Sequence, residues 1–140
     1  MAGIWTPSST RLTEVYPIMN SHQNYNYLMA SYCFDIDGTI FETVGSDYPN
    51  SQPIHHRIAI VNKLYEEGHQ ITFFTARGSM TGIDWRELTE SQLNKWGVRY
   101  HRLILGKPHA DLYVDDKGAN DKHFFSEADS GQQHSNYVGE

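Results

Sequence analysis

The sequence contains little cysteine, little basic charge and no long apolar segment. Cys33 is the only cysteine among 140 residues, which excludes an intramolecular disulfide and a four-cysteine zinc site. Lys and Arg number 11 against 17 Asp and Glu, and the net charge of −6 argues against a duplex-DNA-binding protein, whose phosphate contacts need a basic face. No apolar run approaches the roughly 20 residues of a transmembrane helix.

The two ends of the chain differ in composition from its middle. Residues 1–30 contain one Arg and no apolar core of a signal peptide, so we expect no secretory signal and a cytoplasmic location. We interpret this stretch as an N-terminal arm, either packed on a neighbour or of little consequence for the fold. Residues 126–140 are polar and read as a C-terminal tail. With 39% hydrophobic residues, the chain has the composition of a soluble globular protein, and we expect one domain over 31–125.

Between these ends, short apolar runs alternate with segments of helical periodicity. We expect strands at residues 31–36, 69–75, 100–105 and 110–114. Apolar residues at helical spacing predict one helix within 55–68 and a second that has Asp84 as its N-cap and ends at Gly97. The segment 41–53, with two prolines and a glycine, is predicted to be an irregular loop. This β-α-β-α-β order predicts an α/β fold built on a parallel sheet.

Polar side chains follow each predicted strand. They are Asp35, Asp37, Gly38 and Thr39 after the first strand, Thr75 and Arg77 after the second, Lys107 after the third, and Asp115 and Asp116 after the fourth. In parallel sheets ligands bind at the carboxyl ends of the strands, near the point where strand order reverses, so we expect these groups to converge there. Several carboxylates in one pocket repel each other unless a hard cation such as Mg²⁺ neutralises them. The hydroxyl, the ammonium and the backbone N–H groups around Gly38 suit the oxygens of a phosphate.

Four segments, FDIDGTI, FFTARG, LGKP and YVDD, resemble the four motifs of the haloacid dehalogenase superfamily in the family's order. The resemblance covers about residues 31–121, and the first motif, Asp-x-Asp-Gly-Thr at the end of an apolar strand, is its specific part. It implies a three-layer α/β/α Rossmann-like core. Within the superfamily, the stretch from TARG to YVDD looks like small phosphatases often found with capsule or other surface-sugar biosynthesis.

The resemblance also implies catalytic roles. Asp35 would be the nucleophile that forms an aspartyl-phosphate, and Asp37 would be the general acid and then the general base. A carboxylate at position 37 favours a phosphatase over a dehalogenase or an ATP-driven pump, because an alkoxide leaving group needs a proton. Thr75 would donate to the transferring phosphoryl oxygens, and Lys107 would offset charge on nucleophile and phosphate.

A magnesium site and a substrate-binding set follow from the same resemblance. Asp35, the backbone carbonyl of Asp37 and Asp115 would hold Mg²⁺, with Asp116 a ligand either directly or through water. The substrate-binding set comprises Gly38, Thr39, Thr75, Arg77 and Lys107. Two of its members have an alternative to substrate binding. Thr39 would instead fix the loop after the nucleophile, and Arg77 would instead form an ion pair with an acid.

The spacing between the motifs bears on the substrate. Forty residues separate Asp35 from Thr75 and 32 separate Thr75 from Lys107, which leaves no room for a cap domain in either interval. We therefore expect an open site, a homo-oligomer, and hydrolysis of a sugar phosphate or similar small metabolite, with no nucleic-acid or membrane partner. The alternatives are a phosphatase for a macromolecule, such as a polynucleotide 3′-phosphate or a phosphoprotein, and a catalytically silent phosphate-binding regulatory subunit.

Overall fold

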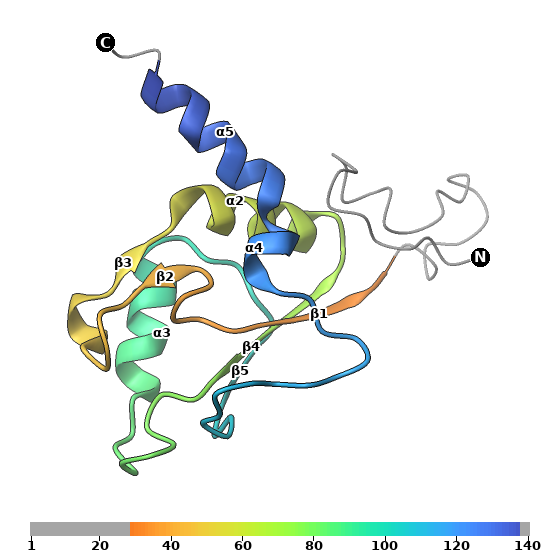
Figure 1. Ribbon diagram of the computed structural model, residues 1–140. Coiled ribbons are helices and arrows are strands. Elements are labelled where there is room, and N and C mark those ends of the chain that lie inside the picture. Colours follow the sequence, from red (N-terminus) through yellow and green to blue (C-terminus); the bar gives the residue numbers. More distant parts are fainter. Residues whose placement is uncertain (1–28, 138–140) are drawn as a thin grey trace. The chain divides into compact units, whose positions relative to one another are not determined.

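The computed structural model describes residues 29–137, so the predicted N-terminal arm lies almost entirely outside the described residues. The chain divides into two compact units (Figure 1). Residues 31–115 form one unit, which holds the sheet. The other includes residues 116–140, with helices α4 (Asp121–Phe124) and α5 (Ser126–Tyr137).

The sheet of the first unit is parallel. Its strands are β1 (Ser31–Phe34), β4 (Gln70–Thr75) and β5 (Arg102–Leu105), in the order β1-β4-β5. Phe34 is paired in register with Phe73, and Thr75 with Leu105, so the three strands end close to one edge. Three of the four predicted strands are thus present, each shorter than expected.

Two helices connect these strands. Helix α2 (His55–Glu66) lies between β1 and β4 in the sequence, and α3 (Arg86–Lys95) lies between β4 and β5. Helix α2 buries the apolar stripe that predicted it, including Val61 and Leu64. Both predicted helices and the α/β character of the fold are confirmed, although the N-cap of α3 is Trp85 and not the predicted Asp84. The arrangement is Rossmann-like. A third layer is not evident among residues 29–137.

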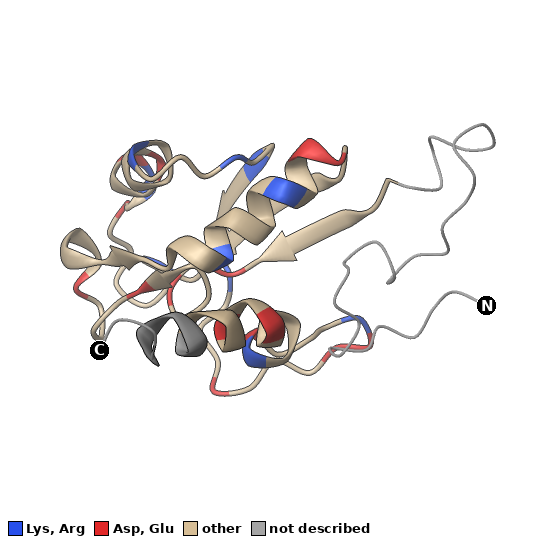
Figure 2. Ribbon diagram, turned by 90° about the horizontal axis from the view of Figure 1, so that it is seen from above, with Lys and Arg blue, Asp and Glu red and all other residues tan. Residues whose placement is uncertain are grey.

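The charged residues of the two connecting helices are mixed in sign, as Figure 2 shows in its view from above. Helix α2 carries Arg57 and Lys63 together with Glu66, and α3 likewise carries both signs. Neither helix has the uniformly basic surface that is typical of proteins that bind nucleic-acid phosphates.

The segment 41–53 is more regular than predicted. Strand β2 (Phe41–Glu42) pairs antiparallel with β3 (Gln52–Pro53), and the 3-10 helix η2 (Tyr48–Asn50) lies between them. Phe41 is fully buried and meets the ring of Trp96 edge to face at 4.7 Å. This anchoring holds a Pro- and Gly-containing segment in a hairpin that its composition alone did not predict.

The prediction of a fourth strand at 110–114 is wrong. The segment carries no strand, and Leu112 and Val114 are 76% and 88% exposed. Ala110 and Asp111 are poor strand formers, and local contacts hold the chain in a loop instead. The Tyr113 hydroxyl donates to the Pro108 carbonyl, and the Lys107 ammonium lies 4.2 Å from the centre of the Tyr113 ring. Without this strand, the sheet of the described chain has no reversal of strand order.

Residues 126–137 also depart from their prediction as part of a polar tail, because they form α5. Glu127 and Asp129 lie in the first turn of α5, where a negative charge opposes the positive end of the helix dipole. The helix has no long apolar stripe, which is why periodicity did not reveal it. Across residues 29–137, every helix is too short or too polar to cross a membrane.

Gly78, in the loop after β4, provides a test of how that loop is held. It has φ +81°, and a Cβ there would lie 2.1 Å from the carbonyl oxygen of Ile83, whereas Gly82, with φ +76°, has open space around it. Gly82→Ala carries only the left-handed backbone penalty, about 1–2 kcal/mol. We expect Gly78→Ala to lower the free energy of unfolding, measured in urea, by more than Gly82→Ala does. Equal losses would contradict the close packing of the loop.

Candidate functional site

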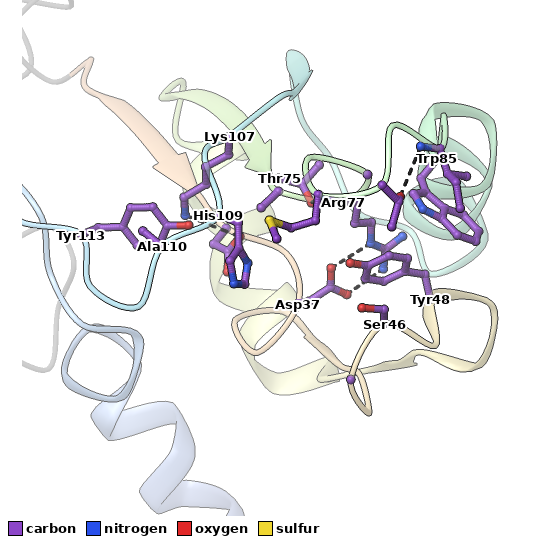
Figure 3. A pocket seen from close by; sticks show the side chains of 17 residues that line it. Asp37, Ser46, Tyr48, Thr75, Arg77, Trp85, Lys107, His109, Ala110 and Tyr113 are labelled. Atoms are coloured by element: carbon purple, nitrogen blue, oxygen red, sulfur yellow. Dashed lines mark hydrogen bonds and ion pairs between the residues drawn. The ribbon is translucent and has the colours of Figure 1, made fainter.

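A pocket of about 540 Å³ opens at the carboxyl ends of the three parallel strands (Figure 3). Asp35 and Asp37 reach it from the loop after β1, Thr75 and Arg77 from the end of β4, and Lys107 from the loop after β5. These five residues, distant in the sequence, are therefore brought together. They were selected from the sequence because each follows an apolar strand.

Asp35 is a partly buried carboxylate beside a cation. Its Oδ1 lies 3.6 Å from the Nζ of Lys107, and its Oδ2 accepts a hydrogen bond from the Thr39 hydroxyl at 3.5 Å. Burial raises the pKa of Asp35, and the charge of Lys107 opposes that rise. Desolvation disfavours the charged form of a carboxyl group, so the neighbouring ammonium of Lys107 helps to keep Asp35 ionised.

Arg77 is completely buried and holds Asp37 in a two-pronged ion pair. The Nε donates to Asp37 Oδ2 and the Nη2 to Asp37 Oδ1, both at 2.8 Å. The Nη1 donates to Thr89 at 3.0 Å and to Gln92 at 2.6 Å, and the Nη2 also donates to Ser51 at 3.3 Å. These contacts use all five N–H groups of the guanidinium. Arg77 therefore realises the alternative in which it pairs with an acid, and it has no donor left for a substrate.

The same network fixes the hairpin of 41–53. The Thr43 hydroxyl donates to Asp37 Oδ1 at 2.6 Å and lies 2.7 Å from the Ser51 hydroxyl. The amide of Gln92 donates to the Tyr48 carbonyl at 2.6 Å while its oxygen receives Arg77. Asp37 is thus held by partners from β4 and from the hairpin, and the hairpin is tied to α3.

Gly38 and Thr39 form the turn after Asp37 and do not line the pocket. Gly38, with φ +82°, donates its N–H to the Phe41 carbonyl at 2.8 Å, and Thr39 donates its N–H to the Ile36 carbonyl at 3.0 Å. Both N–H groups predicted to bind phosphate are used within the turn. The Thr39 side chain instead contacts Asp35, which is the alternative of fixing the loop.

Thr75 and Lys107 lie at neighbouring strand ends. The carbonyl of Thr75 accepts the N–H of Lys107 at 3.1 Å, which ties the two loops together. The Thr75 hydroxyl accepts the N–H of Arg77 at 3.1 Å and retains its own proton for donation into the pocket.

Sequence reasoning missed two aromatic residues of the pocket, Trp85 and Tyr113. Tyr48, Trp85, His109 and Tyr113 all line it, and Figure 3 shows Tyr48 beside the Asp37–Arg77 pair with Trp85 beyond it. The helical spacing of Trp85 by itself would place it in the core. It is only partly buried, since it precedes α3 at the point where the chain leaves the pocket loop. No motif marks these positions.

The predicted magnesium ligands are only partly assembled. Asp35 and Asp37 line the pocket, but Asp115 is exposed and does not, and Asp116 belongs to the other unit. Within residues 29–132, no three His, Cys, Asp or Glu side chains are grouped to hold a metal ion. The physical reason is the absent fourth strand, which was expected to deliver Asp115 to the sheet edge. In this arrangement two of the four predicted ligands, Asp35 and Asp37, lie at the pocket.

The raised pKa of Asp35 predicts a pH-dependent stability. A carboxyl group whose pKa is raised by folding stabilises the fold below its unfolded pKa of about 3.9, and this contribution is lost as the pH rises through the folded pKa. Asp35→Asn cannot ionise. In a chelating buffer, its Tm should exceed that of the native chain at pH 7 and approach it near pH 3, as measured by calorimetry. A Tm difference independent of pH would contradict the burial of this charge.

The Arg77 network predicts a large effect of a conservative substitution. Arg77→Lys keeps the positive charge but loses the fork of two parallel hydrogen bonds from the guanidinium to Asp37, and it leaves other buried partners without a donor. We expect the free energy of unfolding to fall by about 3 kcal/mol or more. Arg99→Lys is the matched control, because Arg99 is half-exposed in its ion pair with Glu66 and its loss should stay within about 1 kcal/mol. Urea unfolding of both variants measures the difference, and similar losses would refute the role of the fork.

Comparisons with known proteins give no matching family model and no matching curated protein. Among solved structures, the chain is similar to the crystal structure of a structural-genomics target from Vibrio cholerae, with a TM-score of 0.63 and 24% identity over 76% of this chain and 99% of that one. A structure of the Pnkp1/Rnl/Hen1 complex has a TM-score of 0.47 and 21% identity over 66% of this chain and 32% of that one. A second structure, of the Pnkp1/Rnl/Hen1 RNA repair complex, has a TM-score of 0.46 and 16% identity over 79% of this chain and 33% of that one. The likeness to the Vibrio cholerae protein is one of fold.

Proposed function

We propose that the chain is a phosphomonoester hydrolase that works through an aspartyl-phosphate on Asp35. The observation that carries the proposal is one pocket in which the carboxylates of Asp35 and Asp37 meet the ammonium of Lys107 and the hydroxyl of Thr75. The resemblance of the motifs to the haloacid dehalogenase superfamily supports the same reaction. A volume of about 540 Å³ suits a small phosphorylated metabolite.

In the first step, a carboxylate oxygen of Asp35 attacks phosphorus. An O–P bond forms as the bond from phosphorus to the leaving oxygen breaks, and that oxygen takes a proton from the protonated form of Asp37. Lys107 and Thr75 offset the charge on the phosphoryl oxygens. Arg77 acts only through Asp37, which it orients.

In the second step, water attacks the phosphorus of the aspartyl-phosphate. Asp37, now a carboxylate, takes the proton of the water, and the bond between phosphorus and the Asp35 oxygen breaks to release inorganic phosphate. Asp37 ends the cycle protonated, as the first step requires. The structure has Asp37 as an acceptor of hydrogen bonds from Arg77 and Thr43, which is the form that the second step uses.

Magnesium is part of the proposal because the resemblance implies it. When bound, it would neutralise charge on the phosphate. Of its proposed ligands, Asp35 and Asp37 line the pocket, whereas Asp115 and Asp116 do not. The steps above are therefore assigned to the side chains alone.

Hydrolysis of p-nitrophenyl phosphate, with Mg²⁺ and with a chelator, tests the proposal. We expect Asp35→Asn to lower kcat/KM by at least about a thousandfold, because it removes the nucleophile. Asp111→Asn, an exposed acid outside the pocket, should leave kcat/KM unchanged.

Two outcomes would overturn parts of this proposal. Full activity in the chelator, or an unchanged Mg²⁺ requirement in Asp115→Asn, counts against the metal site. No turnover of the native chain under either condition, together with measurable phosphate binding, favours the silent phosphate-binding subunit.

A further inference from the structure

Exposed apolar side chains gather at the pocket. Among residues 29–132, seven large hydrophobic side chains are exposed, and three of them, Met80, Ile83 and Tyr113, line this one pocket at 75%, 54% and 50% exposure. Apolar surface that is left in water beside a polar site is typical of a ligand-binding surface.

Two aromatic rings form a fixed wall next to these side chains. The rings of Tyr48 and Trp85 meet edge to face, with centroids 5.1 Å apart and an angle of 76° between their planes. The Arg77 guanidinium lies 4.7 Å from the centre of the Tyr48 ring, and the Tyr48 carbonyl is held by Gln92. Because the buried network holds this wall in place, a ligand that packs on it needs little rearrangement of the protein.

Few charged side chains line the pocket. Apart from Asp35, Asp37, Arg77 and Lys107, the lining contains no Asp, Glu, Lys or Arg. Because Arg77 uses all its donors internally, Lys107 is the cation available to a phosphate. This arrangement suits a substrate with one phosphate and an uncharged organic group, and it leaves the second phosphate of a bisphosphate or a polynucleotide without a partner.

Apart from Thr75, the other polar groups of the lining are the side chains of Ser46, Thr81 and His109 and the polar atoms of Tyr48, Trp85 and Tyr113. Of these, the Thr81 hydroxyl already accepts the N–H of Ile83 at 3.3 Å, and the Tyr113 hydroxyl already donates to the Pro108 carbonyl. A sugar needs a directional partner for each hydroxyl that loses water. A flat ring needs only apolar and aromatic surface.

We infer that the pocket selects phosphomonoesters whose organic group carries a planar aromatic ring, which packs against the surface of Trp85, Tyr48, Met80 and Ile83. This inference rests on the proposed function and narrows its substrate class away from simple sugar phosphates. A nucleoside monophosphate and a small aryl-bearing phosphate share this chemistry.

Two matched substrate pairs test the inference. Adenosine 5′-monophosphate and ribose 5-phosphate differ in the base, and benzyl phosphate and ethyl phosphate differ in the ring, while each pair keeps a similar alkoxide leaving group. We expect the ring-bearing member to have a kcat/KM about tenfold higher, in keeping with the usual gain from stacking on an aromatic side chain. A preference in the first pair identifies a nucleotide, and one in the second identifies a general aryl group. Equal values in both pairs would overturn the inference.

Substitutions in the aromatic and apolar lining test whether it causes the preference for ring-bearing substrates. Trp85→Ala and Met80→Ala should each reduce the ring preference several-fold by acting on the ring-bearing substrates alone, and Trp85→Phe should restore most of it. Leu112→Ala is the control, because Leu112 is as exposed as Met80, at 76%, but lies outside the pocket. Equal losses on both members of a pair would refute the specificity role while leaving the proposed hydrolase intact. Absence of turnover for all four esters and for p-nitrophenyl phosphate would refute the proposed function itself.

Discussion

The buried ion pair between Arg77 and Asp37 is the interaction on which the site depends. A fully buried guanidinium is stable only if each N–H finds a partner, because an unpaired buried charge costs several kcal/mol. Arg77 meets this requirement by drawing in Ser51 from the hairpin and Thr89 and Gln92 from α3. The hydrogen bonds of this one guanidinium therefore fix the hairpin, α3 and the loop after β1 relative to one another.

This constraint separates the roles of the two aspartates. Asp37 is held by the Arg77 fork and the Thr43 hydroxyl, whereas Asp35 has Lys107 at 3.6 Å and a long contact from Thr39. Burial raises the pKa of Asp35. Two acids only two positions apart thus occupy different environments.

The same network also shapes the aromatic surface of the pocket. Tyr48 stands between Arg77 and Trp85, so the residues that orient Asp37 also position the aromatic wall. Asp37 and the wall are therefore held by one network of contacts.

Local patterns in the sequence were enough to predict the three parallel strands and the two helices and to place Asp35, Asp37, Thr75 and Lys107 at the strand ends, because apolar periodicity is a local property. The other features depend on contacts between segments that are distant in the sequence. Arg77 turned inward because its partners come from segments up to 40 residues away. The stretch 110–114 stayed a loop because pairing needs a partner strand that no local pattern supplies, and Asp115 consequently lies outside the pocket. Trp85 and Tyr48 became pocket walls for the same reason: which face of an aromatic ring is covered depends on what folds against it.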